Sequence, residues 1–183
     1  QNQEAQTAMK AIQEASKEGL TREKLLDILS EIKSESALTT VVSLTRSGMD
    51  YQFFQALTER IEKESGEAKQ LFTDLRERLL KITREYDLQM KKQMENAEKV
   101  LNSILEETDL EAAINKHLPE LDEFFSQALR SEFDRANQAG DLARIEKIQK
   151  ISSILEKMSA PPPEIELIQK LLDAPDEAIQ RQV

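Results

Sequence analysis

The sequence predicts an all-α protein made of tandem helical repeats of about 70 residues, arranged as a solenoid-like array or an irregular bundle. The composition is the first reason. Of 183 residues, 33% are charged, only four are glycine and five are proline, so helix is favoured over most of the chain. The second is a near-repetition, "MDYQFFQAL" at residues 49–57 and "LDEFFSQAL" at residues 121–129. The third is the position of the glycines, which fall between predicted helices.

The repetition extends beyond these nine residues. Aligned without gaps, residues 37–57 and 109–129 share six identities in 21 positions. The matched apolar positions have the spacing of helix faces that pack into a core. We therefore divide the chain into residues 1–19, the end of a preceding unit; 20–99, the first repeat; 100–163, the second; and 164–183, the start of a truncated third repeat.

Glycine and proline mark the predicted joints in order along the chain. Gly19 ends the first helix, and Thr21 is the expected N-cap of "REKLLDILSEI". Gly66 and Gly140 separate the third and fourth helices of the two copies. In the second copy, the prolines of "APPPE" remove backbone donors and predict a helix end after Met158.

Asp50 and Asp122 occupy matched positions and are each expected to cap the start of a helix. A carboxylate at the N-cap accepts a hydrogen bond from a free backbone N–H group and lies at the positive end of the helix dipole. This local role explains why both copies have aspartate here.

One long helix is predicted near residues 67–107. No helix-breaking residue follows Gly66 until about Thr108, and apolar residues recur every three or four positions from Leu71 onward. The same spacing also fits a self-associating coiled coil, but the seam is short and includes the polar Gln93. We expect this helix to pack within the chain, with self-association as the alternative.

Charge and cysteine content exclude several classes of function. The net charge of −10 opposes binding to a nucleic-acid backbone, and the absence of cysteine excludes disulfides and thiolate zinc sites. The absence of cysteine gives no support for an oxidising compartment, so a cytoplasmic protein is the default expectation. No apolar run is long enough to span a bilayer, so we expect no membrane insertion. Because the chain begins with Gln1 and ends at Val183 within a helical pattern, we expect it to be part of a longer protein.

Known catalytic and cofactor-binding motifs are absent from the sequence. It has no glycine-rich phosphate loop, nucleophile elbow or calcium loop. Its only histidine, His117, has no nearby partners with metal-ligand spacing and is expected at a helix end. We predict no catalytic residues, no cofactor and no metal site.

The aromatic pairs of the two copies are the strongest candidates for binding residues. Neighbouring helix positions differ by about 100°, so one ring of each pair can enter the core while the other faces a groove. Core packing explains both pairs in the simplest way. The alternative is that Tyr51, Phe54 and Phe124 line a groove that binds a protein partner.

Four segments, "MDYQFFQALTERIE", "LEAAINKHLPELDEFFSQAL", "QAGDLARIEKI" and "APPPEIELIQKLLDAPDEA", resemble helical regions of uncharacterised bacterial proteins, including regions C-terminal to a CpXC-type zinc-binding domain. The resemblance implies a helical part of a bacterial multidomain protein. The Cys-Pro-x-Cys motif is missing here, so no zinc ligand is carried over to this chain.

From these features we expect a non-catalytic module for protein–protein interaction or scaffolding, whose partner the sequence does not identify. One alternative is a regulatory or accessory region of a larger enzyme whose catalytic domain lies outside this chain. Another is a self-associating structural helix bundle. Catalytic motifs in flanking sequence would favour the first alternative, and concentration-dependent mass in solution would favour the second.

Overall fold

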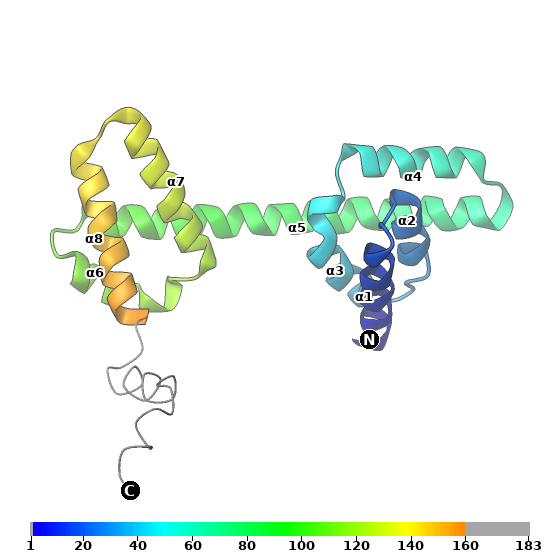
Figure 1. The fold of residues 1–183 in the computed structure, drawn as a ribbon, viewed down its shortest axis with the longest axis horizontal. Helices are drawn as coiled ribbons and strands as arrows, with labels where there is room; N and C mark the ends of the chain where they lie inside the picture. The colour runs from blue at the N-terminus through cyan, green and yellow to red at the C-terminus, as the bar shows by residue number, and fades with distance from the viewer. Residues whose placement is uncertain (1, 160–183) are drawn as a thin grey trace, which may run out of the picture. The chain divides into compact units, whose positions relative to one another are not determined.

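The computed structural model describes residues 2–159 (Figure 1). Every regular element in this range is a helix, which confirms the all-α prediction. The elements are α1 (Asn2–Lys17), α2 (Arg22–Ser30), α3 (Glu35–Thr45), the 3₁₀ helix η1 (Arg46–Gly48), α4 (Tyr51–Lys63), α5 (Gly66–Glu106), α6 (Leu110–Lys116), the 3₁₀ helix η2 (Leu118–Glu120), α7 (Glu123–Ala139) and α8 (Leu142–Ser159). The predicted break at "APPPE" and the predicted third repeat at 164–183 lie outside the described residues.

The chain divides into two compact units at a point inside α5. Residues up to Lys92 belong to unit 1, and residues from Gln93 belong to unit 2, whose described part ends at Ser159. This division describes which residues pack together and does not test whether the two halves are repeats. The repeats at 20–99 and 100–163 therefore stay predictions. The assignment of residues 1–19 to a preceding unit also stays a prediction.

Short polar side chains define where several helices start. Thr21, Ser34 and Asp109 each accept a hydrogen bond from the backbone N–H three residues later, at 3.2, 3.3 and 3.0 Å. Each bond satisfies a backbone donor that the first helical turn leaves free. The start of a helix is therefore set by local chemistry in both units.

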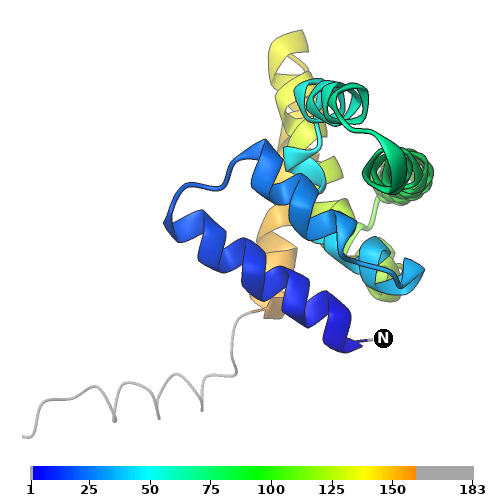
Figure 2. The same ribbon diagram turned by 90° about the vertical axis from the view of Figure 1, so that its right-hand side faces the viewer.

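In unit 1, α1 packs against both α2 and α3, and Figure 2 shows it beside them in dark blue. It contributes Ala5, Ala8 and Ile12 to the core, and small side chains of this kind let helix axes approach closely. The most deeply buried side chains of unit 1 come from the helices that follow: Leu26, Leu29, Leu38, Phe53, Leu57, Leu75 and Leu79.

In unit 2, the C-terminal part of α5 forms a core with α6, α7 and α8. The centre of this core consists of Leu101, Ile104, Ile114, Phe125 and Ile151. Helix α8 packs against both α6 and α7. Several apolar side chains at the edge of this core remain half-buried.

The long helix predicted near 67–107 is α5, at Gly66–Glu106. Its buried side chains belong to two separate cores, which supports packing within the chain: Phe72, Leu75, Leu79 and Ile82 in unit 1, and Ala97, Leu101, Ile104 and Leu105 in unit 2. Leu71, where the predicted apolar spacing starts, lies outside the core. Leu71 is 47% exposed and Phe72 is 4% exposed, because the larger ring takes the core-facing position.

Candidate protein-binding groove

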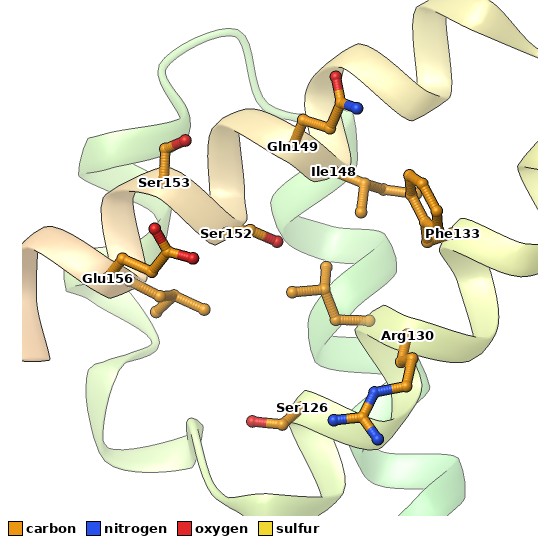
Figure 3. Close-up of a pocket in the computed structure, with 10 residues that line it drawn as sticks. Ser126, Arg130, Phe133, Ile148, Gln149, Ser152, Ser153 and Glu156 are labelled. Atoms are coloured by element: carbon orange, nitrogen blue, oxygen red, sulfur yellow. The ribbon is translucent and has the colours of Figure 1, made fainter.

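An open groove of about 760 Å³ lies between α7 and α8 in unit 2 (Figure 3). Its lining residues recur at helical spacing, so they form one face of each helix. They are Ser126, Leu129, Arg130 and Phe133 on α7, and Ile148, Gln149, Ser152, Ser153, Leu155 and Glu156 on α8. The groove thus uses α7 from its first turn to just past its middle, and α8 from its middle to its last turn.

The floor of the groove is apolar and its rim is polar. Leu129 and Ile148 are 8% and 2% exposed, whereas Phe133 and Leu155 are half-buried against the same core. Figure 3 shows Ser152 pointing into the space between the two helices. An apolar floor with a polar rim is typical of sites that bind a ligand segment by burying its apolar face.

The joint between α7 and α8 sets how the two helices diverge. Gly140 has φ 68°, a left-handed conformation that glycine adopts readily, and its N–H donates to the Asn137 carbonyl at 3.2 Å. The next N–H, of Asp141, donates to the Ala136 carbonyl at 3.0 Å, which completes a Schellman cap. The Asp141 carboxylate then accepts a bond from the Arg144 N–H at 3.1 Å and starts α8.

Two further contacts hold α8 in place. Arg144 Nε donates to the Glu132 carboxylate of α7 at 2.6 Å. Lys147 Nζ donates to the Leu105 carbonyl at 2.8 Å, near the C-terminus of α5, where backbone carbonyls lack helical partners and favour a cation. Both contacts lie nearer to the joint than the open part of the groove, so they fix the helices while leaving the groove accessible.

The aromatic residues predicted to line a groove lie elsewhere. Tyr51 is 81% exposed on the first turn of α4. Phe54, one turn later, is half-buried and packs edge-on against Phe53, with ring centroids 5.3 Å apart. Phe124 is half-buried against the core of unit 2 and does not line the α7/α8 groove. Phe133, which the repeat pattern did not single out, is the aromatic residue of that groove.

The predicted capping aspartates are at helix starts. The Asp50 carboxylate accepts a hydrogen bond from the Phe53 N–H at 2.8 Å, and the Asp122 carboxylate accepts one from the Phe125 N–H at 3.0 Å. His117 follows the last residue of α6, and its Nδ1 lies 3.5 Å from the Glu120 carboxylate. All three residues lie outside the α7/α8 groove.

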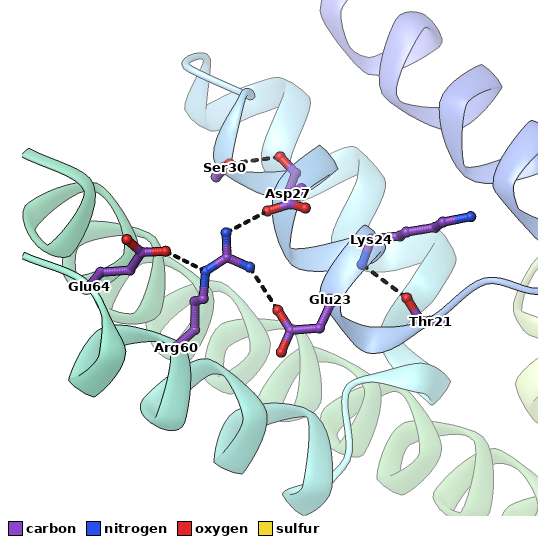
Figure 4. A network of polar contacts seen from close by, with 7 residues as sticks. All are labelled: Thr21, Glu23, Lys24, Asp27, Ser30, Arg60 and Glu64. Carbon is purple, nitrogen blue, oxygen red and sulfur yellow. Dashed lines mark hydrogen bonds and ion pairs between the residues drawn. The ribbon is translucent and has the colours of Figure 1, made fainter.

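Unit 1 has a polar network centred on Arg60 of α4 (Figure 4). The guanidinium contacts Glu64 at 2.7 Å and, on α2, Glu23 at 2.7 Å and Asp27 at 3.1 Å, and it lies over the Phe72 ring at 4.7 Å. Hydrogen bonds to Glu64 and Glu23 raise the pKa of Arg60 above its usual range. The network joins α4 to α2 and has a structural role.

Glu4 anchors α1 to the connection between α2 and α3. Its carboxylate accepts hydrogen bonds from the backbone N–H groups of Lys33, at 2.6 Å, and Ser34, at 3.0 Å. These two bonds lower the pKa of Glu4 below its ordinary value. The sequence contains no local signal for this contact, because its partners lie about 30 residues away.

Within residues 2–159, the structure brings together no group of three or more His, Cys, Asp or Glu side chains that could hold a metal ion. In the same range no helix has the length and apolarity needed to cross a membrane. Comparison with models of protein families, with curated proteins and with solved structures found no match to this chain. Its function is therefore inferred from the groove itself.

Proposed function

We propose that this chain is a non-catalytic helical module for protein–protein interaction, with the α7/α8 groove as its binding site. The observation that carries the proposal is the groove between two helices with an apolar floor, formed by Leu129, Phe133, Ile148 and Leu155. Such a groove fits an amphipathic helix that buries residues at i, i+3, i+4 and i+7. The polar rim then contacts the solvated side of that helix.

We also keep the proposal that the two units derive from a tandem repeat. The order of a short helix, a 3₁₀ turn and an Asp-capped helix occurs in both, as α3–η1–α4 and as α6–η2–α7. Six identities in 21 aligned positions support the same correspondence. The proposed binding groove belongs to one copy. Under this proposal, the elements common to both copies form the helical framework, and residues that differ between the copies form the binding site.

The test is capture of partners by the full chain and two matched variants. Ser126→Arg places a bulky cation in the groove, and Ser103→Arg places the same group on the exposed face of α5 in unit 2. Both serines are exposed and both hydroxyls donate to the carbonyl four residues earlier, so the two changes are similar in their cost to the helix. Circular dichroism and thermal unfolding check that the variants are folded.

A partner that binds the parent and Ser103→Arg but is lost with Ser126→Arg supports the proposal. Binding assays with truncated forms of that partner should show that one helical segment is sufficient for binding. Partners that bind all three proteins equally would overturn the assignment of the groove as the binding site.

A further inference from the structure

We infer that the α7/α8 groove binds the chain's own segment 164–174, "EIELIQKLLDA", in competition with the partner helix. The inference rests on the proposed function of the groove. The lining of the groove on α8 ends at Glu156, three residues before the end of that helix at Ser159, and 24 residues of sequence follow. The nearest candidate ligand is therefore joined to the rim of its own site.

The sequence of this segment matches the chemistry of the groove. As a helix it would place all its large apolar residues on one side, within an arc of about 160°: Ile165, Leu167, Ile168, Leu171 and Leu172. Glu166, Gln169, Lys170 and Asp173 fall on the opposite side, whereas Glu164, the first residue of the segment, falls within the apolar arc. The apolar side suits the floor of Leu129, Phe133, Ile148 and Leu155.

The connection has the length that docking requires. Residues 160–163 are "APPP", and three consecutive prolines prevent α8 from continuing and favour an extended spacer of about 3 Å per residue. Such a spacer, roughly 12 Å long, allows the chain to turn back beside α8. An 11-residue helix is about 16 Å long, and the eight-residue step from Ile148 to Glu156 covers about 12 Å of α8.

Charge favours this partner over most other parts of the chain. Helix α8 has four cationic side chains against two carboxylates, whereas the whole chain has a net charge of −10. Segment 164–174 has three carboxylates, Glu164, Glu166 and Asp173, against the single cation Lys170. None of the four α8 cations lines the groove, whose charged lining residues are Arg130 and Glu156, so the attraction acts at long range on the helix as a whole and not through contacts inside the groove.

The chain itself supplies a precedent for the fold-back. By the repeat correspondence, segment 164–174 follows α8 as α2 follows α1. The joint between α1 and α2 is broken at Gly19, which has φ 92°, and the two helices pack against each other. In α5 the corresponding joint is unbroken and the helix continues. The three prolines of "APPPE" predict, from the sequence, a joint of the broken type.

The consequence is regulation of the groove by a tethered competitor. A segment joined through four residues has an effective concentration in the millimolar range, so even a weak contact keeps the groove largely occupied. A partner helix must then displace the segment to bind. Changes that weaken the internal contact should increase the affinity for the partner.

The absence of native cysteine allows a direct test in the full chain. Two double variants are made, and both contain Gln169→Cys, at the edge of the apolar side of the segment. The first adds Ser126→Cys, which lines the groove, and the second adds Lys150→Cys, at an exposed position of α8 outside the groove. A short bismaleimide reagent is added, and mass spectrometry separates intrachain from interchain products. We expect intrachain crosslinking to be at least about tenfold faster from Ser126→Cys than from Lys150→Cys. Adding Ile168→Asp and Leu172→Asp should abolish this preference.

Equal crosslinking rates from the two positions would overturn the inference, and so would interchain dimers as the main product, since a second copy would then occupy the groove. The two proposals fail separately. If Ser126→Arg loses a partner but crosslinking shows no preference, the binding function stands and the internal contact is wrong. If crosslinking shows the preference but Ser126→Arg loses no partner, the internal contact stands and the binding function is wrong.

Discussion

Units 1 and 2 have one run of elements in common, α3–η1–α4 and α6–η2–α7, but their Asp-capped helices α4 and α7 pair with different neighbours. In unit 1, Arg60 of α4 binds Glu23 and Asp27 of α2. In unit 2, the aligned position on α7 is Glu132, which binds Arg144 of α8. One reversal of charge at a matched position therefore accompanies a change of partner. The Asp-capped helix of each unit is thus joined by charge to a different neighbour, α2 in unit 1 and α8 in unit 2.

The largest expected effect tests whether the two cores are equivalent at their centres. Phe53 and Phe125 are 0% and 1% exposed at aligned positions. Replacing either by Ala should lower the free energy of unfolding by about 3–5 kcal/mol, because it removes buried ring surface and leaves a cavity. Urea unfolding followed by circular dichroism measures both. A loss below about 1 kcal/mol at only one of them would show that the two cores are not equivalent.

The next pair of substitutions compares a leucine in the core of unit 1 with the aligned leucine that lines the groove of unit 2. Leu57 is fully buried, whereas Leu129 lines the groove and is 8% exposed. We expect Leu57→Ala to cost about 3–5 kcal/mol and Leu129→Ala about 2–3 kcal/mol, since the space left beside an open groove is filled by water. Equal costs in urea unfolding would contradict an open groove at Leu129.

Charge reversal tests the choice of partner directly. Arg60→Glu places a fourth carboxylate beside Glu23, Asp27 and Glu64 and should destabilise unit 1 by about 1–2 kcal/mol. Glu132→Arg should destabilise unit 2 by about 1 kcal/mol by placing a cation beside Arg144. Hydrogen exchange assigns each loss to its unit. Adding Asp27→Arg to Arg60→Glu should recover part of the first loss, and no recovery would mean that the pairing is unimportant.

The capping aspartates should behave alike in both units. Asp50→Ala and Asp122→Ala each remove an acceptor for one free backbone N–H at the start of a helix. We expect each to cost about 1 kcal/mol, and Asp→Asn or Asp→Ser to cost less, because those residues also cap. Thermal unfolding of the four variants measures this. A larger effect on partner capture than on stability would instead indicate a binding role.

Local chemistry explains which features could be predicted from the sequence. Helix type and the bounds of α5 depend on neighbouring residues, so the prediction near 67–107 lies within one residue of Gly66–Glu106. The capping positions depend on an interaction over only three residues. Spacing alone does not choose between Leu71, which is exposed, and the adjacent Phe72, which is buried.

The groove could not be predicted, because it does not depend on interactions between neighbouring residues. Its geometry depends on contacts between residues far apart in sequence, such as Lys147 with the Leu105 carbonyl and Arg144 with Glu132. The repeat directed attention to paired aromatic residues, but Tyr51 is exposed and Phe124 faces the core, while Phe133 lies in the groove. Repetition identifies what two copies share, and this groove arises from what they do not share.

The smallest expected effect concerns α1 and depends on pH. Glu4 has a lowered pKa in the folded state because it accepts hydrogen bonds from the Lys33 and Ser34 N–H groups. A carboxylate with a lowered folded pKa stabilises the fold fully above its unfolded pKa, here about 4.5, and this contribution is lost as the pH falls through the folded value. Glu4→Gln should therefore lower the melting temperature at pH 7, and its difference from the parent should shrink as the pH falls below 4.5.

The matched control for this experiment is Glu14→Gln, on the exposed side of the same helix, which should leave the melting temperature nearly unchanged at pH 7. Hydrogen exchange should place the effect of Glu4→Gln in unit 1, around the start of α3. A difference between Glu4→Gln and the parent that stays constant from pH 7 to pH 3 would show that the charge of Glu4 does not hold α1. Glu4, Lys33 and Ser34 all belong to unit 1, so the exchange rates of unit 2 supply an internal reference in every sample.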